Sequence, residues 1–140
     1  MKVLEGFKKM IIVIAIAVPF LIVLSLVTKY FTDLAFYRDS MENITIDNVN
    51  FKTLRDGKYS GTYDAIMVSA SVIVKVTGGK VVTIDVTKNK YEKGISAISI
   101  VKRIIDSQSL NVELVTGAKE DSKAILKAVE KALRSEPSTN

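Results

Sequence analysis

The feature that most constrains this chain is an apolar run near its N-terminus, MIIVIAIAVPFLIVLSLV, which covers residues 10–27 without a charged side chain. A helix of that length can cross the hydrocarbon core of a bilayer, near the short end of the usual range. A small domain has little room to bury such a helix on all sides, and residues 24–28 offer no small-x-small cleavage site. We expect a retained transmembrane anchor over residues 10–28, with a cleaved signal peptide and a buried core helix as the alternatives.

Positive charge before the run predicts its orientation. Lys2, Lys8 and Lys9 precede it, against a single acidic residue, Glu5. Positively charged flanks remain on the cytoplasmic side of a membrane. We therefore expect a cytoplasmic N-terminus over residues 1–9, a single pass through the cell membrane, and an extracytoplasmic domain after it.

The composition excludes several kinds of chemistry. The chain has no Cys and no His, which removes disulfides, thiolate nucleophiles, the commonest metal ligands and the commonest general base. Residues 28–140 carry 17 Lys and Arg against 14 Asp and Glu, a net charge of +3. They contain no basic stripe interleaved with aromatic residues, so nucleic acid is not an expected partner.

Behind the anchor, the sequence predicts a polar spacer and then one small domain. Residues 29–55 mix polar and apolar side chains, and we interpret them as a juxtamembrane spacer in which the anchor helix continues to Tyr37. The turn signal Asp56-Gly57 opens the folded domain, which we expect over residues 56–135. Residues 136–140 form a polar tail.

Period-two patterns predict three strands. Residues 58–65 alternate along one strand, and two β-branched runs at 71–76 and 81–86 flank Gly78-Gly79, which predicts a hairpin. Small or apolar residues recur on one side of each strand, which we expect to face the core: Tyr59, Gly61, Tyr63 and Ala65, then Val72, Val74 and Val76, then Val82, Ile84 and Val86.

Helical spacing follows the strands. One helix is expected from Ile95, with Asp106-Ser107-Gln108-Ser109 ending it. Its inward residues are expected to be Ile95, Ile98, Val101, Ile104 and Ile105. The last helix is expected to bury Ile125, Val129, Ala132 and Leu133, with Lys123, Lys127, Glu130 and Lys131 around its outer side. Strands followed by helices predict an α+β fold, a small antiparallel sheet with helices packed on one face.

A small-residue turn leads into the last helix, at LVTGAKEDS over residues 114–122. Thr116, Gly117 and Ala118 allow close approach to the backbone, the helix start attracts anions, and Lys119 adds a charge suited to phosphate. Acidic residues at 120 and 121 instead favour a capped helix and would repel a phosphate. The residues alone leave both interpretations open.

Four segments carry a resemblance to a known family: DGKYSG at 56–61, the hairpin over 72–86, DSQSLNVELVTGA at 106–118 and SKAILKAV at 122–129. They resemble the small domain family that binds flavin mononucleotide (FMN). That family includes extracytoplasmic flavoprotein subunits of the sodium-pumping quinone reductase and of Rnf complexes. The resemblance implies an anchored, extracytoplasmic bacterial domain that transfers electrons to redox partner proteins or within a membrane complex.

The chain departs from the family at one position. The family pattern is Ser/Thr-Gly-Ala-Thr, and a transferase esterifies the final threonine to the flavin phosphate. Thr116, Gly117 and Ala118 match, but Lys119 has no hydroxyl to esterify. The resemblance implies that these four residues and Ser122 bind FMN, held non-covalently through Lys119. A flavin-free domain that serves as a membrane-tethered binding or accessory module is the main alternative, and covalent attachment at Thr116 or Ser122 is a further one.

Overall fold

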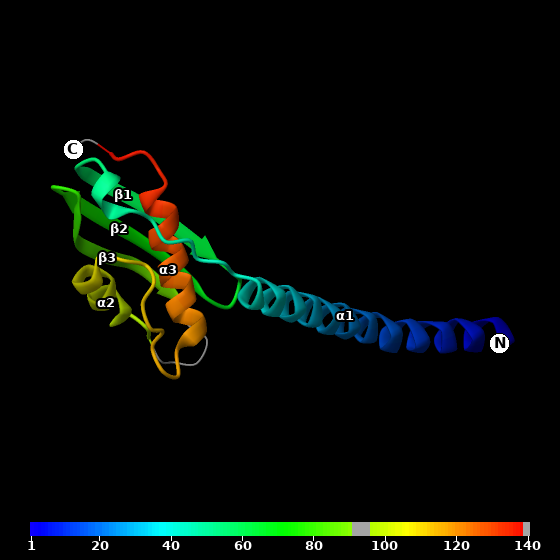
Figure 1. The fold of residues 1–140 in the computed structure, drawn as a ribbon. Helices are drawn as coiled ribbons and strands as arrows, with labels where there is room; N and C mark the ends of the chain where they lie inside the picture. Colours follow the sequence, from blue (N-terminus) through cyan, green and yellow to red (C-terminus); the bar gives the residue numbers. More distant parts are fainter. Residues whose placement is uncertain (91–95, 139–140) are drawn as a thin grey trace. The chain divides into compact units, whose positions relative to one another are not determined.

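A computed structural model of the chain describes residues 1–90 and 96–138 (Figure 1). These residues form two compact units, Met1–Arg38 and Asp39–Asn140. The element order along the chain is α1 (Lys2–Glu42), the 3₁₀-helix η1 (Phe51–Thr53), β1 (Gly57–Asp64), β2 (Ser69–Thr77), β3 (Lys80–Lys90), α2 (Ile100–Ser107) and α3 (Lys119–Leu133).

Helix α1 contains the apolar run and continues without a break through Pro19. Its most apolar window has a mean hydropathy of 3.1, and none of that window is buried. The length and composition suit a single membrane span, and they suit a signal sequence near an N-terminus equally well. The helix ends at Glu42, five residues beyond the expected end at Tyr37.

The three predicted strands are confirmed, and they form one antiparallel sheet in the order β1-β2-β3 (Figure 1). Gly78 and Gly79 join β2 to β3 with φ angles of +60° and +69°. Such positive angles at both turn residues match the right-handed twist of a hairpin, which is why a glycine pair suits this place.

A bulge in β3 corrects the face predicted for that strand. Thr83 pairs with Lys75 and Val81 pairs with Val76, so Val82 is an extra residue without a partner on β2. The alternation shifts by one residue at that point. Val81 is 1% exposed and Val82 is 42% exposed, so Val82 does not face the core as expected.

Helix α3 packs across β1 and β2 on one face of the sheet, which confirms the α+β fold (Figure 1). The four predicted inward residues Ile125, Val129, Ala132 and Leu133 are buried. The approach is close at Gly61 of β1, where an added Cβ would lie 2.2 Å from the Ala128 carbonyl oxygen. Glu130 was expected on the outer side, but it is buried.

Helix α2 is shorter than expected, and its buried face differs. It begins at Ile100 and buries Ile100 and Ile104, while Ile98 precedes the helix and is exposed. Ile95, the predicted first residue, lies outside the described residues. The expected stop is confirmed, since Gln108 has a left-handed conformation after the last turn. Of the predicted inward residues, Ile104 is buried as expected, whereas Ile98 lies before the helix and so does not share a helical face with Val101 and Ile105.

The second unit extends further toward the N-terminus than residue 56. It includes residues 43–50, an irregular segment that we call the strap, and the buried side chains of Met41 and Phe51. Asn50 caps η1 by accepting a hydrogen bond from the Lys52 N–H. The strap is therefore part of the folded unit that contains the sheet.

Candidate functional site

The turn before α3 forms as the small residues predict. The Ala118 N–H donates to the Val115 carbonyl (3.0 Å), and Gly117 has a φ of +79°, which a glycine adopts readily. Thr116 and Gly117 are exposed, while Ala118 stands at the N-cap position without a side-chain cap. The turn thus presents backbone rather than bulky side chains to its surroundings.

Lys119 begins α3 and is exposed. Among the described residues, its ammonium has no hydrogen-bond or ion-pair partner. The first helical hydrogen bond in the helix runs from the Ser122 N–H to the Ala118 carbonyl (2.9 Å). The preceding amides lie outside the helical pattern, at the positive end of a 15-residue helix, which is where an anion binds most readily.

Ser122 lies in the interior of the turn and not on its surface. Its hydroxyl donates to the Ala118 carbonyl (2.7 Å) and accepts from the Val115 N–H (2.9 Å), and the residue is fully buried. Two hydrogen bonds occupy the oxygen, so Ser122 fixes the shape of the turn. The structure offers no exposed hydroxyl at this position.

Asp121 carries a carboxylate into the same region. It is 3% exposed, and its Oδ2 accepts from the Ala97 N–H (2.5 Å) and from Asn89 Nδ2 (3.2 Å). The carboxylate therefore connects the end of β3 and the segment before α2 to the start of α3. Its Oδ1 and the Asn89 Oδ1 are buried without a partner among the described residues.

A pocket of about 420 Å³, which we call the Leu114 pocket, lies along the segment that leads into the turn and is lined by five apolar and three polar residues. Lys123, which lines it, follows Lys119 by one helical turn, so both lysines project from the same face of α3. The pocket and the cationic helix start thus lie on one side of the helix. The lining residues come from three segments: Ile46 and Asn48; Leu110, Asn111, Val112 and Leu114; and Lys123 and Leu126.

The strap forms one wall of the Leu114 pocket, and lysines of α3 hold it in place. The Lys127 ammonium donates to the Thr45 carbonyl of the strap (2.7 Å), and the Lys123 ammonium donates to the Met41 carbonyl (2.8 Å) in the last turn of α1, just before the strap. On the other side of the pocket, Asn48 Oδ1 accepts from the Leu110 N–H (3.0 Å). The strap is therefore bonded both to α3 and to the segment after α2.

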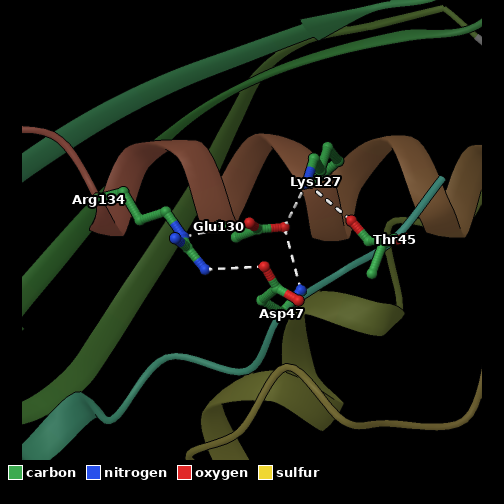
Figure 2. A network of polar contacts seen from close by, with 5 residues as sticks. All are labelled: Thr45, Asp47, Lys127, Glu130 and Arg134. Atoms are coloured by element: carbon green, nitrogen blue, oxygen red, sulfur yellow. Dashed lines mark hydrogen bonds and ion pairs between the residues drawn. The ribbon is translucent and has the colours of Figure 1, made fainter.

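A buried carboxylate, Glu130, completes the attachment of the strap, as Figure 2 shows. Its Oε2 accepts from the Asp47 N–H (3.3 Å) and pairs with Lys127 (2.8 Å), and its Oε1 pairs with Arg134 (3.2 Å). Arg134 also pairs with the Asp47 carboxylate (3.1 Å). Each charge in the cluster has a partner of opposite sign, which accounts for the burial of Glu130.

Gln108 has an architectural role. Its amide accepts from the Val81 N–H (2.9 Å) and donates to the carbonyls of Val81 (2.8 Å) and Ile105 (2.7 Å). The side chain therefore joins the end of α2 to the start of β3. Gln108 belongs to the 106–118 segment that carries the family resemblance, and it holds that segment where it leads to the Leu114 pocket.

The structure places the predicted site residues together at one turn, but they differ in exposure to solvent. Thr116, Gly117 and Lys119 are exposed, whereas Ala118 and Ser122 are buried. Sequence reasoning missed Leu110, Val112 and Leu114, although their alternation before the turn was a usable signal. It also missed the strap, whose sequence has no period.

Metal binding has no support from the described residues, which contain no group of three or more His, Cys, Asp or Glu side chains around a common point. Comparison with protein-family models finds no match for the chain, and no curated protein matches it significantly.

Proposed function

We propose that this chain is a membrane-anchored, extracytoplasmic domain that binds FMN non-covalently and transfers electrons. The observation that carries the proposal is that Lys119, at the start of α3, shares a helix face with Lys123, which lines the Leu114 pocket. FMN has a phosphate at one end and an aromatic ring system at the other. The cationic start of α3 suits the phosphate, and the Leu114 pocket suits the ring.

In this proposal the phosphate binds the free amides at the start of α3 and the Lys119 ammonium. The flavin ring packs against Leu110, Val112 and Leu114, in a pocket whose volume of about 420 Å³ is typical of small-molecule sites. Bound FMN would supply the redox chemistry. The residues of this chain would hold and orient the cofactor, which needs neither Cys nor His.

The proposed location follows from α1 and its flanks. The helix suits a single span, and the three lysines that precede the apolar run favour a cytoplasmic N-terminus. The domain then lies outside the cytoplasm of a bacterial cell, where redox partner proteins or a membrane complex would exchange electrons with it.

One observation favours a second candidate, a flavin-free domain that acts as a membrane-tethered binding or accessory module. Asp121 and Glu120 bring negative charge to the helix start, and the Asp121 carboxylate is buried there. A carboxylate at that position stabilises the helix dipole as a phosphate would, and it repels a phosphate that approaches.

Titration of the full-length chain with FMN in detergent micelles tests the first candidate. We expect saturable binding, measured by the quenching of flavin fluorescence, and about tenfold weaker binding for Lys119→Ala, which removes a charge-assisted contact. Lys88→Ala is the matched control, since Lys88 is an exposed lysine on β3. A wild-type chain that binds no FMN rules out the first candidate.

A Lys119→Thr variant, produced together with a flavin transferase, separates the two candidates. Covalent flavin fluorescence on a denaturing gel would show that the site accepts FMN once the acceptor hydroxyl is restored. A correctly folded variant that remains unlabelled would favour the flavin-free module.

A further inference from the structure

A second pocket, of about 580 Å³, lies between the end of the strap and the β2–β3 turn. We call it the hairpin pocket. It adjoins the Leu114 pocket at Asn48, which lines both. Its walls come from three places in the sequence: Asn48, Val49, Asn50, Phe51 and Lys52; Gly78, Gly79 and Lys80; and Gln108.

Two asparagine amides in this pocket are fixed through their oxygen atoms. Asn50 Oδ1 accepts from the Lys52 N–H (3.2 Å), and Asn48 Oδ1 accepts from the Leu110 N–H (3.0 Å) and the Ser109 hydroxyl (3.3 Å). Within the described part of the chain, neither NH₂ group has a partner. These two side chains therefore have donors available and oxygen atoms already in use.

The charged side chains that line the pocket are hydrogen-bond donors as well. Lys52 and Lys80 line it, and of its described lining residues none is acidic. The Asp56 carboxylate accepts from the N–H of Gly78 (2.7 Å), a lining residue, so it adjoins the glycine turn, although it does not line the hairpin pocket itself. The third amide, Gln108, has both ends occupied by backbone groups of Val81 and Ile105.

The glycine turn closes one side of the pocket. A Cβ added at Gly79 would lie 3.3 Å from the Lys52 carbonyl oxygen, so the backbone of the turn packs directly on η1. The two lysines are thereby presented from adjoining walls, one on η1 and one at the start of β3.

We propose that the hairpin pocket binds a small organic oxyanion, a phosphomonoester or a dicarboxylate. Its available side-chain polar groups are donors, two of them cationic, and such a set recognises oxygen acceptors that carry negative charge. The volume exceeds what a bare inorganic ion fills and is typical of small-molecule sites. This proposal does not depend on FMN binding.

Calorimetric titration of the full-length chain in detergent micelles tests it, with glycerol 1-phosphate, succinate and inorganic phosphate as probes and with chloride added to equal ionic strength. We expect saturable binding of glycerol 1-phosphate or succinate, tighter than that of inorganic phosphate. No saturable binding of either organic probe would overturn the proposal.

An Asn50→Asp variant localises the site. Aspartate keeps the oxygen that caps η1, so the fold and its thermal midpoint should be preserved, while the NH₂ donor becomes a second anionic oxygen. We expect binding of the organic probe to fall at least about tenfold. Ser60→Asp adds the same negative charge at an exposed position on β1 that lies outside this pocket, and it should leave the binding unchanged.

Equal losses of probe affinity in the two variants would overturn the assignment, because the loss would then follow from the added negative charge wherever it stands and not from this pocket. FMN titration of Asn50→Asp keeps the two sites separate: FMN affinity should be unchanged while affinity for the organic oxyanion falls. Loss of both affinities together would overturn the proposal of an independent oxyanion site.

Discussion

The polar side chains of residues 108–122 have two different roles. Gln108 and Ser122 use their hydrogen-bonding atoms on backbone groups and so fix the shape of the chain. Thr116 and Lys119 remain exposed and are the side chains of the turn that a ligand can reach. Residues 108–122 therefore combine architectural residues with candidate binding residues, and the sequence alone does not distinguish the two groups.

Glu130 is a residue whose removal should be costly. Glu130→Ala takes the shared anion from Lys127, Arg134 and the Asp47 N–H, so we expect a loss of about 2–4 kcal/mol in the free energy of unfolding. Chemical unfolding followed by circular dichroism measures it.

Glu136→Ala is the control for this prediction. Glu136 pairs with Arg55, but both side chains are largely exposed, so the loss should stay below about 1 kcal/mol. Similar losses in the two variants would contradict the view that burial makes the Glu130 cluster important.

Tyr63 should make stability depend on pH in the alkaline range. Partial burial raises the pKa of Tyr63 above its ordinary value. The unfolded chain then ionises first as the pH rises through about 10, so this residue lowers the free energy of unfolding there and has no such effect at pH 8. We expect Tyr63→Phe to decline less than wild type between pH 8 and 10.5 in urea unfolding. An equal decline in both proteins would contradict this expectation.

Among the elements, β1 and α3 lie so close at Gly61 that added volume has no space there. A Cβ at Gly61 would lie 2.2 Å from the Ala128 carbonyl oxygen and 2.4 Å from the Ala132 nitrogen, both of them backbone atoms that cannot rotate away. We expect Gly61→Ala to destabilise the fold by about 3 kcal/mol or more, seen as a large drop in the thermal midpoint.

Gly78→Ala provides the comparison. Gly78 has a φ of +60°, but an added Cβ meets nothing within 4 Å. The cost is then mainly that of the left-handed conformation, about 1 kcal/mol. A smaller effect at Gly61 than at Gly78 would mean that the helix can move away from the sheet.

The elements also show what sequence periodicity predicts well. Three strands, the hairpin turn and the inward face of α3 follow from local patterns, because alternation and helical spacing directly reflect burial. The face of β3 near Val82 was wrong because one extra residue reverses the alternation. The face of α2 was predicted only in part: Ile104 is buried as expected, but Ile98 precedes the helix and is exposed, because a run rich in isoleucine does not identify its own first residue.

At the scale of the whole molecule, the site depends on contacts that no local pattern encodes. The turn and the start of α3 could be predicted from the small residues at 116–118. The pockets could not, because both are lined by the strap, which lies about 60 residues away from Leu110 along the chain. Its attachment depends on lysine side chains that, from the sequence alone, would be assigned to a solvated face.

The orientation of the whole chain can be tested directly, because it has no Cys. A cysteine introduced at Ser60, which is exposed on β1, should react with a membrane-impermeant maleimide in spheroplasts, and one at Gly6 should react only after the membrane is opened. The reverse labelling would contradict a cytoplasmic N-terminus. An intact mass that lacks the first residues would contradict a retained anchor.

The strap has a practical consequence for work on this protein. A soluble fragment that begins at residue 56, where the sequence signals a fold, would lack Ile46 and Asn48 from one pocket and residues 48–52 from the other. It would also remove the Asp47 N–H that Glu130 accepts from and the Thr45 carbonyl that Lys127 donates to. A fragment that begins at Asp39 keeps these segments together, and its ligand affinities can be compared with those of the full chain.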